Sequence, residues 1–129
     1  SSFDLINYKV INELPAIEGK VASAIVKIRV NGVTKISASD GEGPVHAMDL
    51  ALRAALSDFY PEIARMSLVD YKVRVLDSDK ATAAKVRVLI TSADSADSWT
   101  TVGVSEDIIE ASWIALTDSI DYALLRREK

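Results

Sequence analysis

The chain has 129 residues, of which 49% are hydrophobic and 26% are charged, and its formal net charge is −4. This length suits one domain with a sizeable core, and the composition excludes a disordered, collagen-like or low-complexity chain. The slight acidity gives no reason to expect nucleic acid, and the lack of cysteine excludes disulfides and a cysteine nucleophile. No apolar run approaches the roughly 18 residues that span a bilayer, so we expect no membrane segment and a cytoplasmic protein.

The first half of the chain predicts strands followed by a helix. Residues 3–11 have a mixed pattern, whereas apolar and charged residues alternate over 26–30 and predict a strand. Asn31-Gly32 is a tight hairpin signal, which makes residues 33–39 the returning strand. Proline suits the first helical position, and apolar residues then recur at three- and four-residue steps, so we expect a helix over 44–59.

The second half predicts the same order of elements. Apolar residues alternate over 69–75 and again over 86–90, and both segments are predicted strands. A polar loop over 92–98 precedes a third strand over 99–104. Acidic residues at the start and basic residues at the end then favour a helix over about 106–127.

We therefore predict an α+β fold of the order βββα-βββα, with two similar halves of about 1–62 and 63–129 in one domain. Tyr8-Lys9-Val10 matches Tyr71-Lys72-Val73, which supports an internal duplication. Small residues recur at four-residue spacing on one face of both helices and would let each helix approach a sheet closely. These residues are Ala47, Ala51 and Ala55 in the first helix, and Ala111, Ala115 and Ser119 in the second.

His46 is the single histidine of the chain, and it follows Asp40 and Glu42 and precedes Asp49. Such a cluster could bind a metal, but it is also typical of a polar helix start. We predict no metal site and no catalytic residues here. A Ser/His/acid triad would have to use this one imidazole, and the chain has no Gly-x-Ser-x-Gly motif.

Gly41-x-Gly43-Pro44 precedes the first predicted helix. This arrangement could hold an anion on the free amide groups of a helix start. These residues alone are more typical of a turn that needs glycine for a positive φ. The aromatic residues are too few for a base-stacking surface and are expected in the core or in interfaces. They are Tyr60, Tyr71, Trp99, Trp113 and Tyr122.

Five stretches of the sequence go beyond a general pattern, namely 41–53, 68–77, 82–90, 99–105 and 108–113. In order and over nearly the whole chain, they resemble the C-terminal regulatory (dimerisation) domain of the 2-isopropylmalate synthase and citramalate synthase family. The forms Gly-x-Gly-Pro-Val-His-Ala and Ile-Ile-Glu-Ala-Ser-Trp lean towards citramalate synthase.

The resemblance implies a duplicated βββα domain with pseudo-twofold symmetry that binds a branched-chain amino acid for feedback inhibition. Members of this family have a catalytic TIM barrel, which uses acetyl-CoA and a divalent metal. A barrel of about 250 residues has no room in this chain. The resemblance thus implies a homodimeric regulatory domain without catalytic activity or a cofactor of its own, from an acetyl-CoA-dependent acyltransferase. The apolar segment 108–116 also favours dimerisation.

The effector-binding residues that the resemblance implies are Glu42, Gly43, Pro44, Val45, Leu68, Tyr71 and Val75. A helix start can receive the effector's carboxylate, and aliphatic side chains can bury its tail. Leu68 has the opposite strand parity from Tyr71 and Val75, so a bend near 68–69 is needed to bring the three together. The segment 77–81 is longer than the usual turn of the family.

Three hypotheses follow. The first is an isoleucine-sensing domain of a citramalate synthase. The second is a leucine-sensing domain of a 2-isopropylmalate synthase. The third is a dimerisation module that binds no effector.

Overall fold

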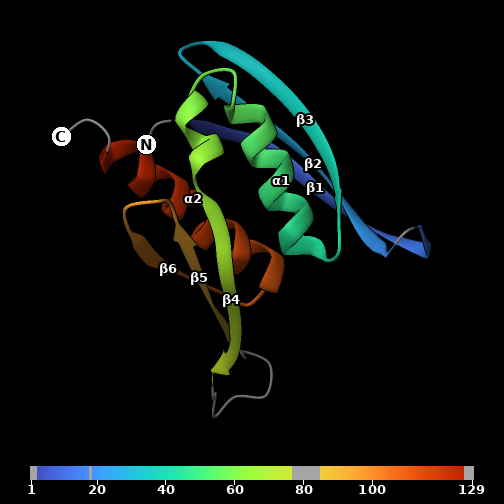
Figure 1. The fold of residues 1–129 in the computed structure, drawn as a ribbon. Helices are drawn as coiled ribbons and strands as arrows, with labels where there is room; N and C mark the ends of the chain where they lie inside the picture. The colour runs from blue at the N-terminus through green and yellow to red at the C-terminus, as the bar shows by residue number, and fades with distance from the viewer. Residues whose placement is uncertain (1–2, 18, 77–84, 127–129) are drawn as a thin grey trace. The chain divides into compact units, whose positions relative to one another are not determined.

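The computed structural model describes residues 3–17, 19–76 and 85–126. The chain divides into two compact units, Ser1–Ala64 and Arg65–Lys129. Within the described residues, each unit has a three-stranded antiparallel sheet followed by a helix (Figure 1). The predicted α+β fold with the order βββα-βββα is therefore confirmed. That the two units act together as one regulatory domain stays a prediction.

Unit 1 contains the sheet β1-β2-β3, and helix α1 packs against β2 and β3. Its elements are β1 (Asp4–Ile17), β2 (Lys20–Val30), β3 (Val33–Gly41) and α1 (Pro44–Leu56), and the 3₁₀ helix η1 (Pro61–Arg65) follows them. The β1–β2 hairpin continues past the end of β3 (Figure 1), because β1 still pairs with β2 beyond the last partners of β2 and β3.

The hairpin between β2 and β3 is the one that the sequence predicts. Asn31 has a φ of 49° and Gly32 a φ of 81°, so both central residues are left-handed. Two left-handed residues make a turn whose twist matches that of the flanking strands. This turn fixes the register in which Val30 pairs with Val33.

Helix α1 ends at Leu56, three residues before the predicted end. The amides of Phe59 and Tyr60 both donate to the carbonyl of Leu56, at 3.0 and 2.8 Å, and close a turn there. Pro61 disfavours the helical conformation for Tyr60, so the helix cannot continue into η1. The apolar pattern continues to Phe59, but the backbone leaves the helix first.

Unit 2 contains the sheet β4-β5-β6, and helix α2 packs against β5 and β6. Its elements are β4 (Ser67–Leu76), β5 (Lys85–Ala93), β6 (Ser98–Ser105) and α2 (Ile108–Arg126). The connection between β5 and β6 is shorter than the predicted loop over 92–98, since Ser92 pairs with Trp99 and Ala93 with Ser98.

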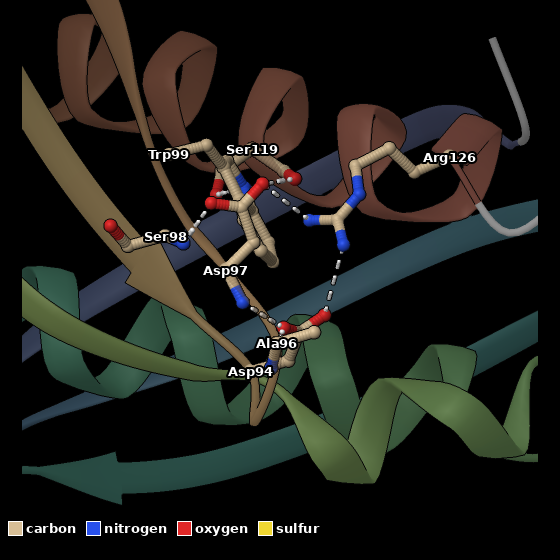
Figure 2. Close-up of polar contacts among 7 residues, drawn as sticks. All are labelled: Asp94, Ala96, Asp97, Ser98, Trp99, Ser119 and Arg126. Carbon is tan, nitrogen blue, oxygen red and sulfur yellow. Dashed lines mark hydrogen bonds and ion pairs between the residues drawn. The ribbon is translucent and has the colours of Figure 1, made fainter.

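The carboxylate of Asp94 makes this connection a tight turn. Its Oδ1 accepts hydrogen bonds from the amides of Ala96 and Asp97, each at 2.9 Å, and these bonds lower the pKa of Asp94. Figure 2 shows Arg126, near the end of α2, reaching over this turn. The Arg126 guanidinium lies 3.7 Å from a carboxylate oxygen of Asp94 and of Asp97, and 5.1 Å from the Trp99 ring centroid. The turn and the C-terminal part of α2 are thereby joined.

Alternate residues of the central strands form the core of each unit. In β2 they face α1, and in β5 they face α2, as the alternating pattern predicts. The small residues that the sequence places on one helix face are all buried, which confirms the predicted close packing. In unit 2 this layer includes a buried polar pair, Ser92 and Ser119, whose hydroxyl oxygens lie 2.6 Å apart.

Both helices rest directly on the backbone of the third strand. A Cβ added at Gly41 of β3 would lie 2.4 Å from the amide nitrogen of Ala47 in α1. A Cβ added at Gly103 of β6 would lie 1.9 Å from the carbonyl oxygen of Ala111 in α2. Real Cβ atoms do not approach backbone atoms so closely, so each unit needs a glycine at this point. Here the reason for glycine is space, not a left-handed backbone.

We expect Gly103→Ala to lower the free energy of unfolding by about 2–4 kcal/mol, because the new methyl group must push α2 away from β6. Urea denaturation of the variant measures this loss. Val102→Ala is the matched control, since Val102 is 44% exposed on the other face of β6 and should change stability by less than about 1 kcal/mol. Equal stability of Gly103→Ala and the wild type would contradict this account of the helix packing.

Candidate functional site

The residues that the family resemblance assigns to effector binding lie in two segments. Glu42, Gly43, Pro44 and Val45 form the loop into α1 in unit 1. Leu68, Tyr71 and Val75 lie on β4 in unit 2. Each segment is described within its own unit. The segment 77–81 lies outside the described residues.

Gly43 has no structural need to be glycine. It is the N-cap residue of α1, with a φ of −164° and a ψ of 175°, an extended conformation that any residue can adopt. A Cβ at this position would have nothing within 4 Å among the described residues. The positive-φ explanation for this glycine is therefore wrong. The open space leaves the backbone of the loop accessible to a ligand.

The loop before α1 is held by His46. The backbone amide of Glu42 donates to Nδ1 of the imidazole at 3.1 Å, so this nitrogen is the acceptor. Among the described residues, no side chain caps the first turn of α1, and that turn contains no acid. The start of α1 therefore keeps the partial positive charge that favours an anion.

The start of α2 is different, because its own side chains cap it. Asp107 precedes the helix, and its Oδ1 accepts a hydrogen bond from the amide of Ile109 at 2.8 Å. Ser105 accepts from the amide of Asp107 at 3.1 Å and donates to Oε1 of Glu110 at 2.8 Å. Acidic side chains thus occupy the place where an anion would bind. The two helix starts have diverged.

On β4, an extra residue brings the predicted side chains to one face. Leu68 pairs with Ser92 and Asp70 pairs with Thr91, so Val69 is extra in the ladder. Directly opposed residues of antiparallel strands share a face. Leu68, Tyr71 and Val75 oppose Ser92, Ile90 and Val86, which alternate along β5 on the face towards α2. The bend that the resemblance requires near 68–69 is present.

The extra residue Val69 is a β-bulge, so the simple alternation that the sequence predicts at the start of β4 is wrong there. Val69 does not share a face with Tyr71, Val73 and Val75, because the extra residue reverses the parity on its N-terminal side. Val73 does share it, opposite Val88, and it is absent from the set that the resemblance implies. Since α2 packs mainly against β5 and β6, Val73 and Val75 remain 40% and 69% exposed.

Tyr71 contacts α2 through its hydroxyl group. The hydroxyl oxygen lies 3.4 Å from Oγ of Ser112, and this Oγ donates to the carbonyl of Ile108 at 2.7 Å. Ser112 is fully buried. Strand periodicity places Tyr71 on this face, but only the packing of α2 reveals Ser112 as its partner.

Asp49 is the buried carboxylate of α1. Burial raises its pKa above the usual value of 3.8, although Arg53, with Nε at 3.4 Å, and His46 both act in the opposite direction. Among the described residues, no group of three His, Asp or Glu side chains could hold a metal ion. Asp49 is 5% exposed and pairs with Arg53 one turn along α1, so it is part of the packing of unit 1.

Both tryptophans are buried in the core of unit 2. Trp99 and Trp113 are 8% and 6% exposed, which confirms the prediction that they belong to the core. The indole nitrogen of Trp99 donates to the carbonyl and the hydroxyl of Ser119, both at 3.1 Å.

Neither α1 nor α2 is long and apolar enough for a membrane-spanning helix, within the part of the chain that the structure describes.

Comparison with known proteins identifies the family. The sequence pattern of the LeuA allosteric (dimerisation) domain matches residues 1–124. The chain belongs to this domain family. It is a regulatory domain, as the resemblance implies.

Its relatives include several citramalate synthases. The chain is 48% identical to an (R)-citramalate synthase of Aquifex aeolicus (strain VF5) over 98% of its length. It is 44% identical to one of Geobacter sulfurreducens, also over 98%. A 2-isopropylmalate synthase of Aquifex aeolicus is 31% identical over 86% of the chain. The chain spans 24%, 24% and 20% of the lengths of these relatives.

We expect Asp49→Asn to gain stability relative to the wild type as the pH rises from about 4 to about 7. With a raised pKa, folded Asp49 binds its proton more tightly than the unfolded chain does. The stability linked to that proton is complete below the unfolded pKa and is lost as the pH rises through the folded pKa. Urea denaturation of both proteins across this range measures the difference. A difference that moves in favour of the wild type would show that the pKa is not raised.

Proposed function

We propose that this chain is the isoleucine-sensing regulatory domain of a citramalate synthase and acts in feedback inhibition. The observation that carries the proposal is the match of nearly the whole chain to an allosteric domain, with (R)-citramalate synthases at 48% and 44% identity. The 2-isopropylmalate synthase of Aquifex aeolicus is 31% identical, against 48% for the citramalate synthase of the same organism. This difference favours isoleucine over leucine as the effector.

The chemistry of the two segments supports an amino-acid effector. Gly43 leaves open space at the start of α1, where the uncapped amides and the helix dipole favour a carboxylate. Leu68 and Val75 lie on one face of β4 and offer aliphatic surface for a branched tail. Tyr71, between them, adds a ring and a hydroxyl group. We propose Glu42, Gly43, Pro44 and Val45 as the effector-binding residues of unit 1, and Leu68, Tyr71 and Val75 as those of unit 2.

The remainder of the protein is also part of the proposal. The chain spans about a quarter of the citramalate synthases that it matches, so the catalytic reaction would belong to the rest of the protein. We propose that this rest is a TIM-barrel acyltransferase, which uses acetyl-CoA and a divalent metal. On this proposal the 129 residues perform no catalysis.

We further propose that the chain forms a homodimer. The domain family is described as allosteric and as a dimerisation domain. Ile108, at the start of the predicted apolar segment of α2, is 41% exposed. A module that only dimerises and binds no amino acid is the alternative function of a different class.

Calorimetric titration of the chain with isoleucine, leucine and valine tests the proposal. We expect isoleucine to bind most tightly and to raise the melting temperature, since a ligand that binds only the folded state contributes about 2.7 kcal/mol at a hundredfold excess over Kd. Light scattering on the same sample should give twice the chain mass of 14.0 kDa. Tighter binding of leucine would favour the 2-isopropylmalate synthase alternative. A dimer that binds none of the three would leave only dimerisation.

Two substitutions test whether the two segments bind the effector. We expect Gly43→Ala and Val75→Ala each to weaken isoleucine binding by about 10- to 200-fold, through a blocked approach and a lost apolar contact. Both should change the free energy of unfolding by less than about 1 kcal/mol, because the Gly43 position is open and Val75 is 69% exposed. Titration and urea denaturation of each variant measure the two effects.

Matched controls separate binding from folding in this test. Val104→Ala removes the same groups as Val75→Ala from a strand residue that is 43% exposed on the opposite face of the sheet, so binding should not change. Gly41→Ala introduces the same methyl group as Gly43→Ala but places it against Ala47, so it should lower stability. Unchanged affinity in Gly43→Ala or in Val75→Ala would remove that segment from the proposed site.

A further inference from the structure

The contact between Tyr71 and Ser112 has a direction that follows from counting protons. A serine hydroxyl has one proton, and that of Ser112 is donated to the carbonyl of Ile108 at 2.7 Å. Oγ of Ser112 can therefore only accept from its other neighbour. The hydroxyl of Tyr71, at 3.4 Å, is consequently the donor in this pair.

This direction decides what Tyr71 can offer to a ligand. A phenol hydroxyl also has a single proton, and here it points to Ser112. The lone pairs of the Tyr71 oxygen remain as hydrogen-bond acceptors. An acceptor recognises a group that carries protons, and a cationic donor makes the stronger bond.

Tyr71 lies between two aliphatic side chains on one face of β4. Leu68 and Val75 lie on the same face of β4, on either side of it along the strand. Tyr71 is half-buried, whereas Ser112 is fully buried behind it. A ligand whose aliphatic tail lies on this face would bring the groups on its α-carbon near the Tyr71 oxygen.

We propose that Tyr71 accepts a hydrogen bond from the α-ammonium group of the bound amino acid and that Ser112 is a positioning residue that keeps Tyr71 an acceptor. This inference rests on the proposed function and names the ligand group that distinguishes the effector. A 2-oxo acid with the same tail presents a carbonyl oxygen in place of the ammonium group. Two acceptors would then face each other, so the domain would respond to the amino acid and not to its 2-oxo acid.

Unit 1 has the corresponding tyrosine without the serine. Tyr8 lies on β1 opposite Val26, as Tyr71 lies on β4 opposite Ile90. In the alignment of the two helices, Met48 stands where α2 has Ser112. A thioether has no proton to donate to a backbone carbonyl, so it cannot form the same chain of hydrogen bonds.

Titration with an amino acid and its matching 2-oxo acid tests the inference. The probes are the tightest binding of isoleucine, leucine and valine, and the 2-oxo acid with the same side chain. We expect Tyr71→Phe to weaken amino-acid binding by roughly 10- to 150-fold, the usual range for a hydrogen bond to a charged group, and to leave binding of the 2-oxo acid unchanged. The preference for the amino acid should fall by the same factor.

The role of Ser112 is tested by the same preference, which is the ratio of the affinities for the amino acid and for its 2-oxo acid. We expect Ser112→Ala to reduce the preference for the amino acid, since the Tyr71 proton is then free to point at the ligand. Adding Ser112→Ala to Tyr71→Phe should cause no further loss of the preference, because Ser112 acts through Tyr71. Ser112→Thr keeps the hydroxyl and should restore the preference.

Thr117→Ala is the matched control on α2. Thr117 also donates to the carbonyl four residues before it, that of Trp113, at 3.1 Å, so a general effect on the helix would appear in this variant too. We expect its preference to equal that of the wild type. A loss of preference in Thr117→Ala as large as in Ser112→Ala would overturn the positioning role.

The remaining outcomes separate this inference from the proposed function. A wild type that binds the amino acid and loses no preference in Tyr71→Phe overturns the inference alone. A wild type that binds none of the three amino acids overturns the proposed function, and this inference with it.

Discussion

In both units the helix touches the backbone of the third strand at one glycine, Gly41 in β3 and Gly103 in β6. Gly41 and Gly103 make this possible, since a methyl group at either would collide with backbone atoms of the helix. The contact holds α1 over β2 and β3, and α2 over β5 and β6. The first strand of each sheet is left partly uncovered. Because α2 covers β5 and β6, Val75 on the first strand of that sheet stays 69% exposed.

The two helix starts use the same backbone arrangement for different purposes. Asp107 and Ser105 satisfy the amides before and within the first turn of α2, and they place negative charge there. At α1 the described side chains leave the first turn uncapped, and His46 instead holds the amide of Glu42. A helix start that is already capped contributes to stability, whereas one that is open can bind an anion. This asymmetry is consistent with a ligand that engages one of the two units at its helix start.

The sequence predicts the parts of this fold that local chemistry determines. The alternation in β2 and the Asn31-Gly32 turn both agree with the structure, because each depends on neighbouring residues. The bulge at Val69 cannot be read from alternation, since an extra residue is defined only against the partner strand. The pairing of Tyr71 with Ser112 joins residues far apart in the chain, so only the packing of α2 reveals it.

The candidate site shows the same division. Its residues come from the family resemblance, and neither periodicity nor composition selects them. Local reasoning offers two explanations for Gly43, an anion site or a left-handed turn. The backbone angle of −164° removes the second. Val73 was missed because the resemblance names only some of the residues on its face, and the strand pairing adds it.

The bulge in β4 also bears on the history of the chain. The register of β1 shifts between Leu5 and Asn7, and that of β4 shifts between Leu68 and Asp70, each just before a Tyr-Lys-Val sequence. A register shift at the same place in both halves is explained more simply by common origin than by two independent events. If the two halves descend from one βββα unit, that unit already had this bulge. The capped start of α2 and the Ser112 partner of Tyr71 are differences that the two copies acquired afterwards.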